Sequence, residues 1–138
     1  MAKELQNRTE RYENVRQAHQ NEMAEDYVEL IAELIDSVGE ARVVDLAERF
    51  GVSHPTVNKV VGRLQREGLV TSRPYRSIFL TEDGQALAEE VRRRHRIVFD
   101  FLCSIGVSET TAAMDAEGIE HHVSEETLTA MERIIGSR

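Results

Sequence analysis

The chain has 138 residues, of which 41% are hydrophobic, and a formal net charge of −8, which fits one ordinary domain or two small ones that share an interface. No apolar run approaches the roughly 18 residues of a membrane-spanning helix and no signal-peptide pattern opens the chain, so we expect a cytoplasmic protein without membrane contact. The single cysteine, Cys103, excludes an internal disulfide and a zinc site built from several cysteines.

The charge is distributed unevenly along the chain. Between Ser53 and Arg76 five basic residues stand against one acidic residue, a local charge of +4, which leaves −12 for the remainder. A basic segment inside an acidic protein predicts a DNA-contacting surface beside a region that attracts cations.

Residues 1–21 are polar and mixed in charge, and we interpret them as an arm that is either a helix extension or partly disordered. The first firm helix is predicted over residues 22–38, where apolar side chains recur at helical spacing and Gly39 closes the segment. The acidic residues of this helix, Glu22 among them, share the opposite face, which is the usual appearance of a solvated surface.

A helix-turn-helix followed by a hairpin is predicted next. A short helix over residues 43–50 ends at Gly51, and Ser53 is the expected N-cap of a second helix that runs to Glu67. Strand-like segments at 69–73 and 77–81 are joined by residues 74–76 and form a β-hairpin. This order of elements is typical of a winged helix-turn-helix.

The second half of the chain is predicted to be entirely helical. Thr81 can cap a helix over residues 82–102, Ser108 opens a short helix through residues 115–122, and Ser124 caps a last helix to about Ile135. The fold class we expect is therefore mainly α, with an N-terminal winged helix-turn-helix followed by an all-helical domain.

The exposed side of the second helix of the helix-turn-helix, residues 53–67, is expected to enter the major groove of DNA. The alternative is a small helical core with a solvated basic face. The side chains able to reach bases or phosphates are Ser53, His54, Thr56, Asn58, Lys59 and Arg63, with Arg73 and Arg76 of the hairpin on the flanking backbone.

Residues 115–122 contain a candidate metal-binding motif. Glu117, Glu120 and His121 are spaced i, i+3 and i+4, so on a helix they would point the same way. Carboxylate and imidazole without thiolate suit a hard or borderline divalent ion such as Mn(II). The more common meaning of such a motif by itself is a solvated acidic face, and His95 by itself is more often a core histidine.

Five segments, in this order, resemble the manganese-responsive branch of the diphtheria-toxin-repressor family: residues 26–29, 51–57, 75–81, 94–95 and 115–122. The resemblance implies a homodimeric repressor of manganese homeostasis genes, with a winged helix-turn-helix and a helical dimerisation domain. It also implies two Mn(II) ions per chain, held by shared carboxylates, with the ligands Asp26, Glu29, His95, Glu117, Glu120 and His121. Iron-responsive relatives carry methionine in place of Asp26 and cysteine in place of Glu117, so the oxygen donors here favour manganese. His122 is expected to be structural or to support a ligand.

The implied ligands divide between two bodies, since Asp26 and Glu29 precede the helix-turn-helix and the other four follow it. Bound ions would restrict the separation of the two recognition helices in the dimer and so raise its affinity for palindromic double-stranded operator DNA. The expected domains are an arm at 1–21, a DNA-binding domain at 22–81, and a metal-binding and dimerisation domain at 82–138.

Two other functions compete with this interpretation. A metal-dependent hydrolase is disfavoured, because the sequence has no His-Glu-x-x-His motif, no glycine-rich phosphate loop and no nucleophile with a matched base, so we expect no enzyme. A regulator of the same fold could instead respond to Fe(II), Zn(II) or a small organic ligand.

Overall fold

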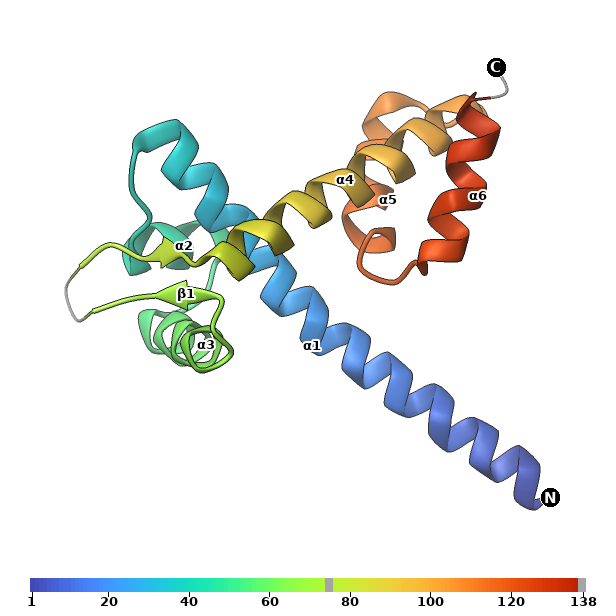
Figure 1. Ribbon diagram of the computed structural model, residues 1–138, viewed down its shortest axis with the longest axis horizontal. Helices are drawn as coiled ribbons and strands as arrows, with labels where there is room; N and C mark the ends of the chain where they lie inside the picture. The colour runs from blue at the N-terminus through green and yellow to red at the C-terminus, as the bar shows by residue number, and fades with distance from the viewer. Residues whose placement is uncertain (74–75, 137–138) are drawn as a thin grey trace. The chain divides into compact units, whose positions relative to one another are not determined.

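The computed structural model describes residues 1–73 and 76–136, and within these it is mainly helical (Figure 1). The elements of the described chain are α1 (Ala2–Val38), α2 (Val43–Phe50), α3 (His54–Arg66), β1 (Val70–Thr71), β2 (Phe79–Leu80), α4 (Glu82–Ser104), α5 (Glu109–Ile119) and α6 (Glu125–Gly136). The predicted fold class is confirmed: a helix-turn-helix with a small two-stranded wing precedes a helical domain. Among the described helices, none combines the length and the apolar character needed to cross a membrane.

The chain forms two compact units. One unit is Ala24–Arg93, and the other combines Met1–Met23 with Arg94–Arg138. The boundaries between the two units fall inside the long helices α1 and α4. Each of these helices therefore has one part in each unit.

The first unit is built around the apolar face of α1, as its helical spacing predicts. Tyr27 stacks on Phe50 of α2 with ring centroids 4.5 Å apart, and burial raises the pKa of the Tyr27 hydroxyl. The buried cluster joins α1 to the helix-turn-helix and the wing through Ile31, Leu34, Leu46, Val57, Val61, Leu64, Val70 and Ile78. Packing in this core therefore fixes the position of α3 relative to α1, α2 and the wing.

The turn between α2 and α3 has the predicted chemistry. Gly51 takes the left-handed conformation at φ 67° that ends α2. Ser53 is the N-cap of α3, and its Oγ accepts a hydrogen bond from the Thr56 backbone N–H at 3.3 Å. These local signals explain why α3 was predicted almost to the residue.

The wing is shorter than predicted. Val70 pairs with Leu80 and Thr71 with Phe79, so the antiparallel ladder has two residues on each side. The predicted strands end early because Ile78 forms a bridge with Ala41 instead, and its N–H donates to the Ala41 carbonyl at 2.8 Å. Of the predicted connecting turn, Pro74 and Tyr75 lie outside the described residues.

A carboxylate ties the wing to the loop before α2. Ser77 donates a hydrogen bond to Glu40 at 3.0 Å, and this bond together with one from Arg42 lowers the pKa of the Glu40 carboxyl. Glu40 therefore remains ionised at neutral pH and continues to accept both bonds.

Helix α1 begins at Ala2, well before the predicted start at Glu22. The segment from Ala2 to Glu22 contains neither glycine nor proline and consists largely of good helix formers. Gln17 and Asn21, one turn apart, also share a side-chain hydrogen bond of 3.1 Å. Of the two alternatives for residues 1–21, the helix extension is therefore confirmed. The start at Glu22 marks only where the apolar periodicity begins, because helical propensity extends further towards the N-terminus.

The helices of the second half begin where their caps predict. Thr81 Oγ1 accepts from the Gly84 N–H at 3.1 Å, and Ser124 Oγ accepts from the Thr127 N–H at 3.2 Å. The last three helices pack around a small core of Ile97, Val98, Ala116 and Leu128. A side-chain hydroxyl that caps the first turn thus sets where each helix starts, and packing in this core sets the direction of the helix.

Gly84 lies where α4 meets the chain after α3, and we expect Gly84→Ala to destabilise the DNA-binding unit. A Cβ at this position would lie 2.0 Å from the Leu69 carbonyl oxygen, so the backbone must shift. Overpacking of this kind costs about 1–3 kcal/mol. Thermal unfolding measures the loss. Gly62→Ala, in α3, is the matched control, because its Cβ would meet only Arg66 Nη1 at 3.6 Å; equal melting temperatures for the two variants would contradict the close approach.

Candidate metal centre and nucleic-acid interface

Three side chains of the kinds that bind metal ions meet in the unit of Met1–Met23 with Arg94–Arg138, which contains the C-terminal part of α4 and the helices α5 and α6. His95 lies on α4 and Glu117 on α5, and Glu120 is the residue that caps the C-terminus of α5. His95 Nδ1 lies 2.7 Å from Glu120 Oε2 and 3.8 Å from Glu117 Oε1. Two donors that each lie about 2 Å from one ion are about 3–4 Å apart. The pair at 3.8 Å has this spacing, whereas the pair at 2.7 Å is at hydrogen-bond distance, so His95 and Glu120 share a hydrogen bond. The three side chains lie close enough together to bind a single divalent cation.

Glu120 is the centre of the arrangement. Its side chain is 0% exposed, and burying a carboxylate is costly unless opposite charge and hydrogen bonds compensate. One oxygen, Oε2, faces His95, while the other, Oε1, lies 3.5 Å from His121 Nε2. Arg94 Nη1 donates to the Glu120 backbone carbonyl at 3.1 Å and so helps to hold the turn. A buried carboxylate between two imidazoles is a donor set suited to hard or borderline divalent ions.

The prediction that one helix continues through residues 115–122 is wrong at its C-terminal end. Helix α5 ends at Ile119, and His121 and His122 lie in the turn that follows. The His122 N–H bonds to the Ile119 carbonyl at 2.9 Å, three residues back, because the chain must turn within a few residues to reach the cap of α6. His121 therefore lies in the turn, while Glu117 lies on the helix.

The second group of donors contains a residue that the sequence analysis missed. A ligand atom of Glu22 on α1 lies within 4.8 Å of one on His121, which is itself buried. Glu22 was interpreted as part of a solvated acidic face, because residues at that spacing usually are. The available signal was its position four residues before Asp26, on the same side of the helix.

The remaining predicted ligands, Asp26 and Glu29, lie on α1 within the Ala24–Arg93 unit. They are three residues apart, so they share one face of the helix. The structure thus brings together His95, Glu117 and Glu120, with His121 beside Glu120.

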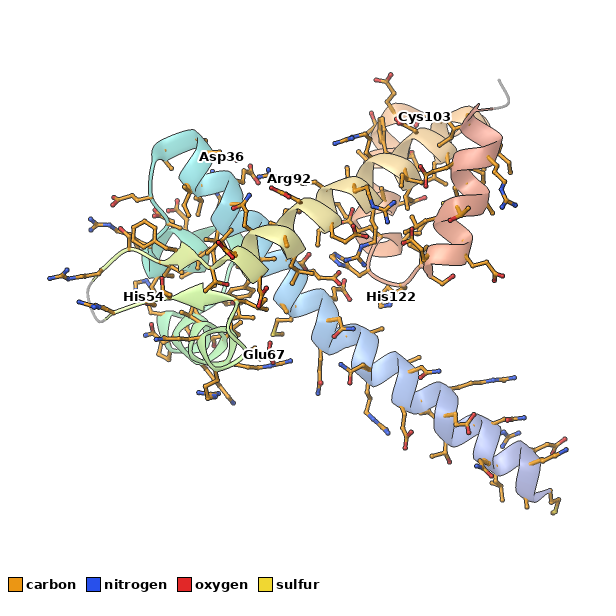
Figure 2. All side chains as sticks on the ribbon, in the orientation of Figure 1. Asp36, His54, Glu67, Arg92, Cys103 and His122 are labelled. Atoms are coloured by element: carbon orange, nitrogen blue, oxygen red, sulfur yellow. The ribbon has the colours of Figure 1, made fainter. Side chains whose placement is uncertain are left out.

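The recognition surface of α3 is open to solvent. His54, Thr56, Asn58 and Lys59 are exposed, while Val57, Val61 and Leu64 face the core. Figure 2 shows His54 and Glu67 at the two ends of this helix. Some predicted contacts already have partners: Arg63 Nε lies 2.9 Å from Glu67 Oε1, and Ser53 Oγ lies 2.9 Å from Thr56 Oγ1.

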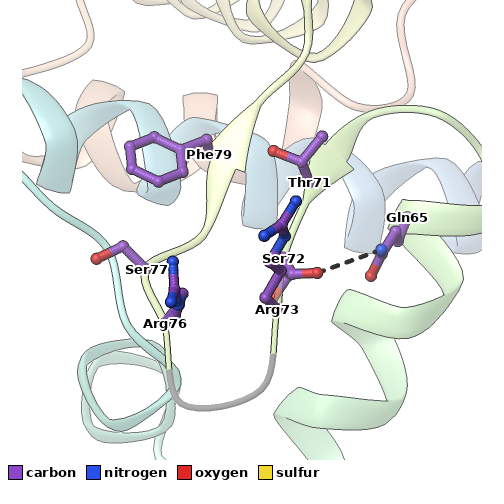
Figure 3. A pocket seen from close by; sticks show the side chains of 7 residues that line it. All are labelled: Gln65, Thr71, Ser72, Arg73, Arg76, Ser77 and Phe79. Carbon is purple, nitrogen blue, oxygen red and sulfur yellow. Dashed lines mark hydrogen bonds between the residues drawn. The ribbon is translucent and has the colours of Figure 1, made fainter.

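A groove of about 550 Å³ lies between the end of α3 and the wing (Figure 3). Arg73 and Arg76, the two wing arginines predicted to contact DNA, are both exposed and both line it. Gln65 Nε2 donates to the Ser72 carbonyl at 3.3 Å and closes one side. The sequence analysis missed this glutamine, since nothing in its local pattern indicates that it reaches the wing.

Two family models match the chain. One is described as "Iron dependent repressor, N-terminal DNA binding domain" and covers residues 20–78. The other is described as "Iron dependent repressor, metal binding and dimerisation domain" and covers residues 81–138. DNA and a second copy of the chain are therefore partners of this protein.

The chain is also similar to transcriptional regulators of two bacteria. The transcriptional regulator MntR of Escherichia coli O6:H1 is 54% identical over 126 residues, which are 91% of this chain and 81% of that protein. The protein of the same name from Salmonella typhimurium is 52% identical over 126 residues, 91% of this chain and 80% of its own.

Among solved structures, a manganese-dependent transcriptional repressor in complex with manganese has a TM-score of 0.73 and 30% sequence identity. The match covers 83% of this chain and 53% of the solved one, so this chain spans about half its length. Together with the exposed α3 and the carboxylate–imidazole cluster, these matches confirm the predicted resemblance. The chain belongs to the iron-dependent repressor family, and it is a metal-dependent DNA-binding transcriptional regulator and not an enzyme.

Proposed function

We propose that the chain is a Mn(II)-activated repressor of manganese homeostasis genes, which binds palindromic operator DNA as a homodimer. The observation that carries the proposal is the buried Glu120 carboxylate, which lies 2.7 Å from His95 Nδ1 and 3.5 Å from His121 Nε2. Oxygen and imidazole donors without thiolate favour Mn(II) over softer ions. Similar proteins carry the name MntR, and one solved relative is described as manganese-dependent. A protein that acts on operator DNA is expected in the cytoplasm.

The site we propose holds two ions per chain. Glu120 would be shared between them, since its two oxygens face different imidazoles. The full ligand set is the one implied by the family resemblance: Asp26, Glu29, His95, Glu117, Glu120 and His121. The domain limits we propose, 22–81 and 82–138 with an arm at 1–21, are supported by the nearby limits of the family matches at 20–78 and 81–138.

The mechanism follows from where the ligands come from in the chain. Asp26 and Glu29 belong to the DNA-binding unit, and the other four ligands belong to the dimerisation unit. A bound divalent cation supplies the positive charge that lets these carboxylates approach without repulsion. If an ion bound both sets of ligands, Asp26 and Glu29 would restrict the positions of the winged unit, and the two α3 helices of the dimer would keep a separation that matches two half-sites.

The DNA contacts we propose are those predicted from the sequence. Ser53, His54, Thr56, Asn58, Lys59 and Arg63 would face the major groove, and Arg73 and Arg76 the adjacent phosphates. The exposure of the first turns of α3 and of both wing arginines supports this assignment.

Titration with Mn(II) tests the proposed function. An operator is first selected from a random-sequence library of duplex DNA with the Mn(II)-loaded protein, and its affinity is then measured by gel shift. We expect Mn(II) to raise the affinity by about 5- to 150-fold, the usual range of such couplings, and a chelator to reverse the gain. Equal affinity with and without Mn(II) would contradict the proposal, and an equal or larger gain with Fe(II) or Zn(II) alone would assign the sensor to that ion.

A further inference from the structure

A second cluster of donors surrounds the turn after α5, and the family ligand set leaves most of it unused. Glu22 Oε2 lies 3.3 Å from His122 Nε2. The ring of His122 also meets the ring of His19 edge-on, with centroids 5.9 Å apart. A ligand atom of Glu22 lies within 4.8 Å of one on His121. All four residues belong to the unit of Met1–Met23 with Arg94–Arg138.

The local structure explains how these residues come together. His19 and Glu22 are three residues apart on α1 and so point to the same side of the helix. His121 and His122 are consecutive in a turn, which lets the first imidazole be buried while the second remains partly exposed. The Glu22 carboxylate therefore has one imidazole on its solvent side and another on its buried side.

We propose that Glu22 is a further metal ligand, which binds the same ion as His121, and that His122 and His19 are positioning residues that hold its carboxylate. The inference rests on the proposed metal site and adds a ligand to it. The separation of at most 4.8 Å between Glu22 and His121 is close to the roughly 3–4 Å of two donors on one ion. A rotation of the Glu22 side chain, which is 32% exposed, would close the difference.

The added carboxylate has a consequence for metal specificity. Mn(II) favours carboxylate oxygen and six-coordinate geometry, whereas Zn(II) is usually satisfied by four donors. An additional oxygen donor therefore stabilises Mn(II) more than Zn(II), against the intrinsic order of affinities, in which Zn(II) exceeds Mn(II). Glu22 would thus help the site to discriminate between the two ions.

The competing explanation is that Glu22 only forms a surface ion pair with His122. Such pairs contribute little when both side chains are partly exposed, as they are here at 41% for His122 and 32% for Glu22. In that case, removal of the Glu22 charge would leave metal binding unchanged.

The test measures Mn(II) binding to the full-length protein by electron paramagnetic resonance of the free ion, and Zn(II) binding by the Mn(II) that it displaces, because Zn(II) gives no signal of its own. We expect Glu22→Gln to lower the affinity for one of the two Mn(II) ions by at least about 10-fold. The affinity for Zn(II) should fall by less. Glu13→Gln is the matched control, since it removes the same charge from an exposed position of α1, and it should bind like the parent. Circular dichroism verifies that both variants keep the helical content of the parent.

His122→Ala separates positioning from ligation. We expect it to weaken Mn(II) binding by less than Glu22→Gln does, because the carboxylate remains available but is less well held. Unchanged binding by Glu22→Gln, or a larger loss from His122→Ala than from Glu22→Gln, overturns the inference. If the parent itself binds no Mn(II), the proposed function fails with it; if the parent binds two ions and Glu22→Gln does the same, only this inference fails.

Discussion

Replacing Glu120 with alanine should abolish the gain in operator binding that Mn(II) produces. Glu120 is fully buried, and its two oxygens face His95 and His121, so its removal takes away the carboxylate that lies beside both imidazoles. The loss should equal the whole metal-dependent gain, about 5- to 150-fold, and the affinity measured without metal should stay near that of the parent. A gel shift with and without Mn(II) measures both.

The fold of the variant must be checked separately, because His95 loses a hydrogen-bond partner. Glu120→Gln keeps the shape of the side chain and removes only its charge, so it should behave like the alanine variant in DNA binding. Glu126→Ala, exposed on α6, is the control. Sedimentation should show that all three variants remain dimers. Normal activation by Mn(II) in either Glu120 variant would place the metal centre elsewhere.

The double variant Arg73→Ala with Arg76→Ala should bind the operator much more weakly, and with a shallower dependence on salt. Both arginines are exposed on the wing and line the groove beside α3. Each lost phosphate contact reduces the slope of log K against log salt by about 0.9. Two contacts per protomer would therefore reduce the slope of a dimer by up to about 3.6. Filter binding at several salt concentrations measures the effect.

The metal affinity of the DNA-free double variant should equal that of the parent, because neither arginine is among the proposed ligands. Arg96→Ala with Arg133→Ala removes the same number of charges from exposed positions of the other unit, and it serves as the control. If both double variants change the salt slope equally, the effect comes from net charge and the wing is not a contact surface.

The helix-turn-helix could be predicted because its signals are local. Gly51 supplies the left-handed residue that ends α2, and Ser53 caps α3 through a backbone N–H three residues away. Such interactions form between neighbours in sequence, so the residue types alone indicate them. The same holds for Thr81 and Ser124, which begin α4 and α6 where expected.

Three features escaped prediction for a different reason. The bridge between Ala41 and Ile78 joins residues far apart in the chain and shortens the wing. Helix α5 stops at Ile119 because the chain must turn into α6, and this stop leaves His121 in the turn and not on the helix. Glu22 looks like a solvated residue until the fold brings it to His121. None of these three features can be predicted from the residue types that lie within a few positions of it in the sequence.

The amino-acid sequence by itself determined which donor types are present, where most helices begin, and that a basic segment follows the first apolar helix, since these depend on residue chemistry and short spacing. Only the tertiary structure decided which donors meet: Glu120 between His95 and His121, and Glu22 beside the turn after α5. The reason is physical. Packing of α4, α5 and α6 around their own core sets the direction of each side chain, and that packing is a property of distant residues acting together.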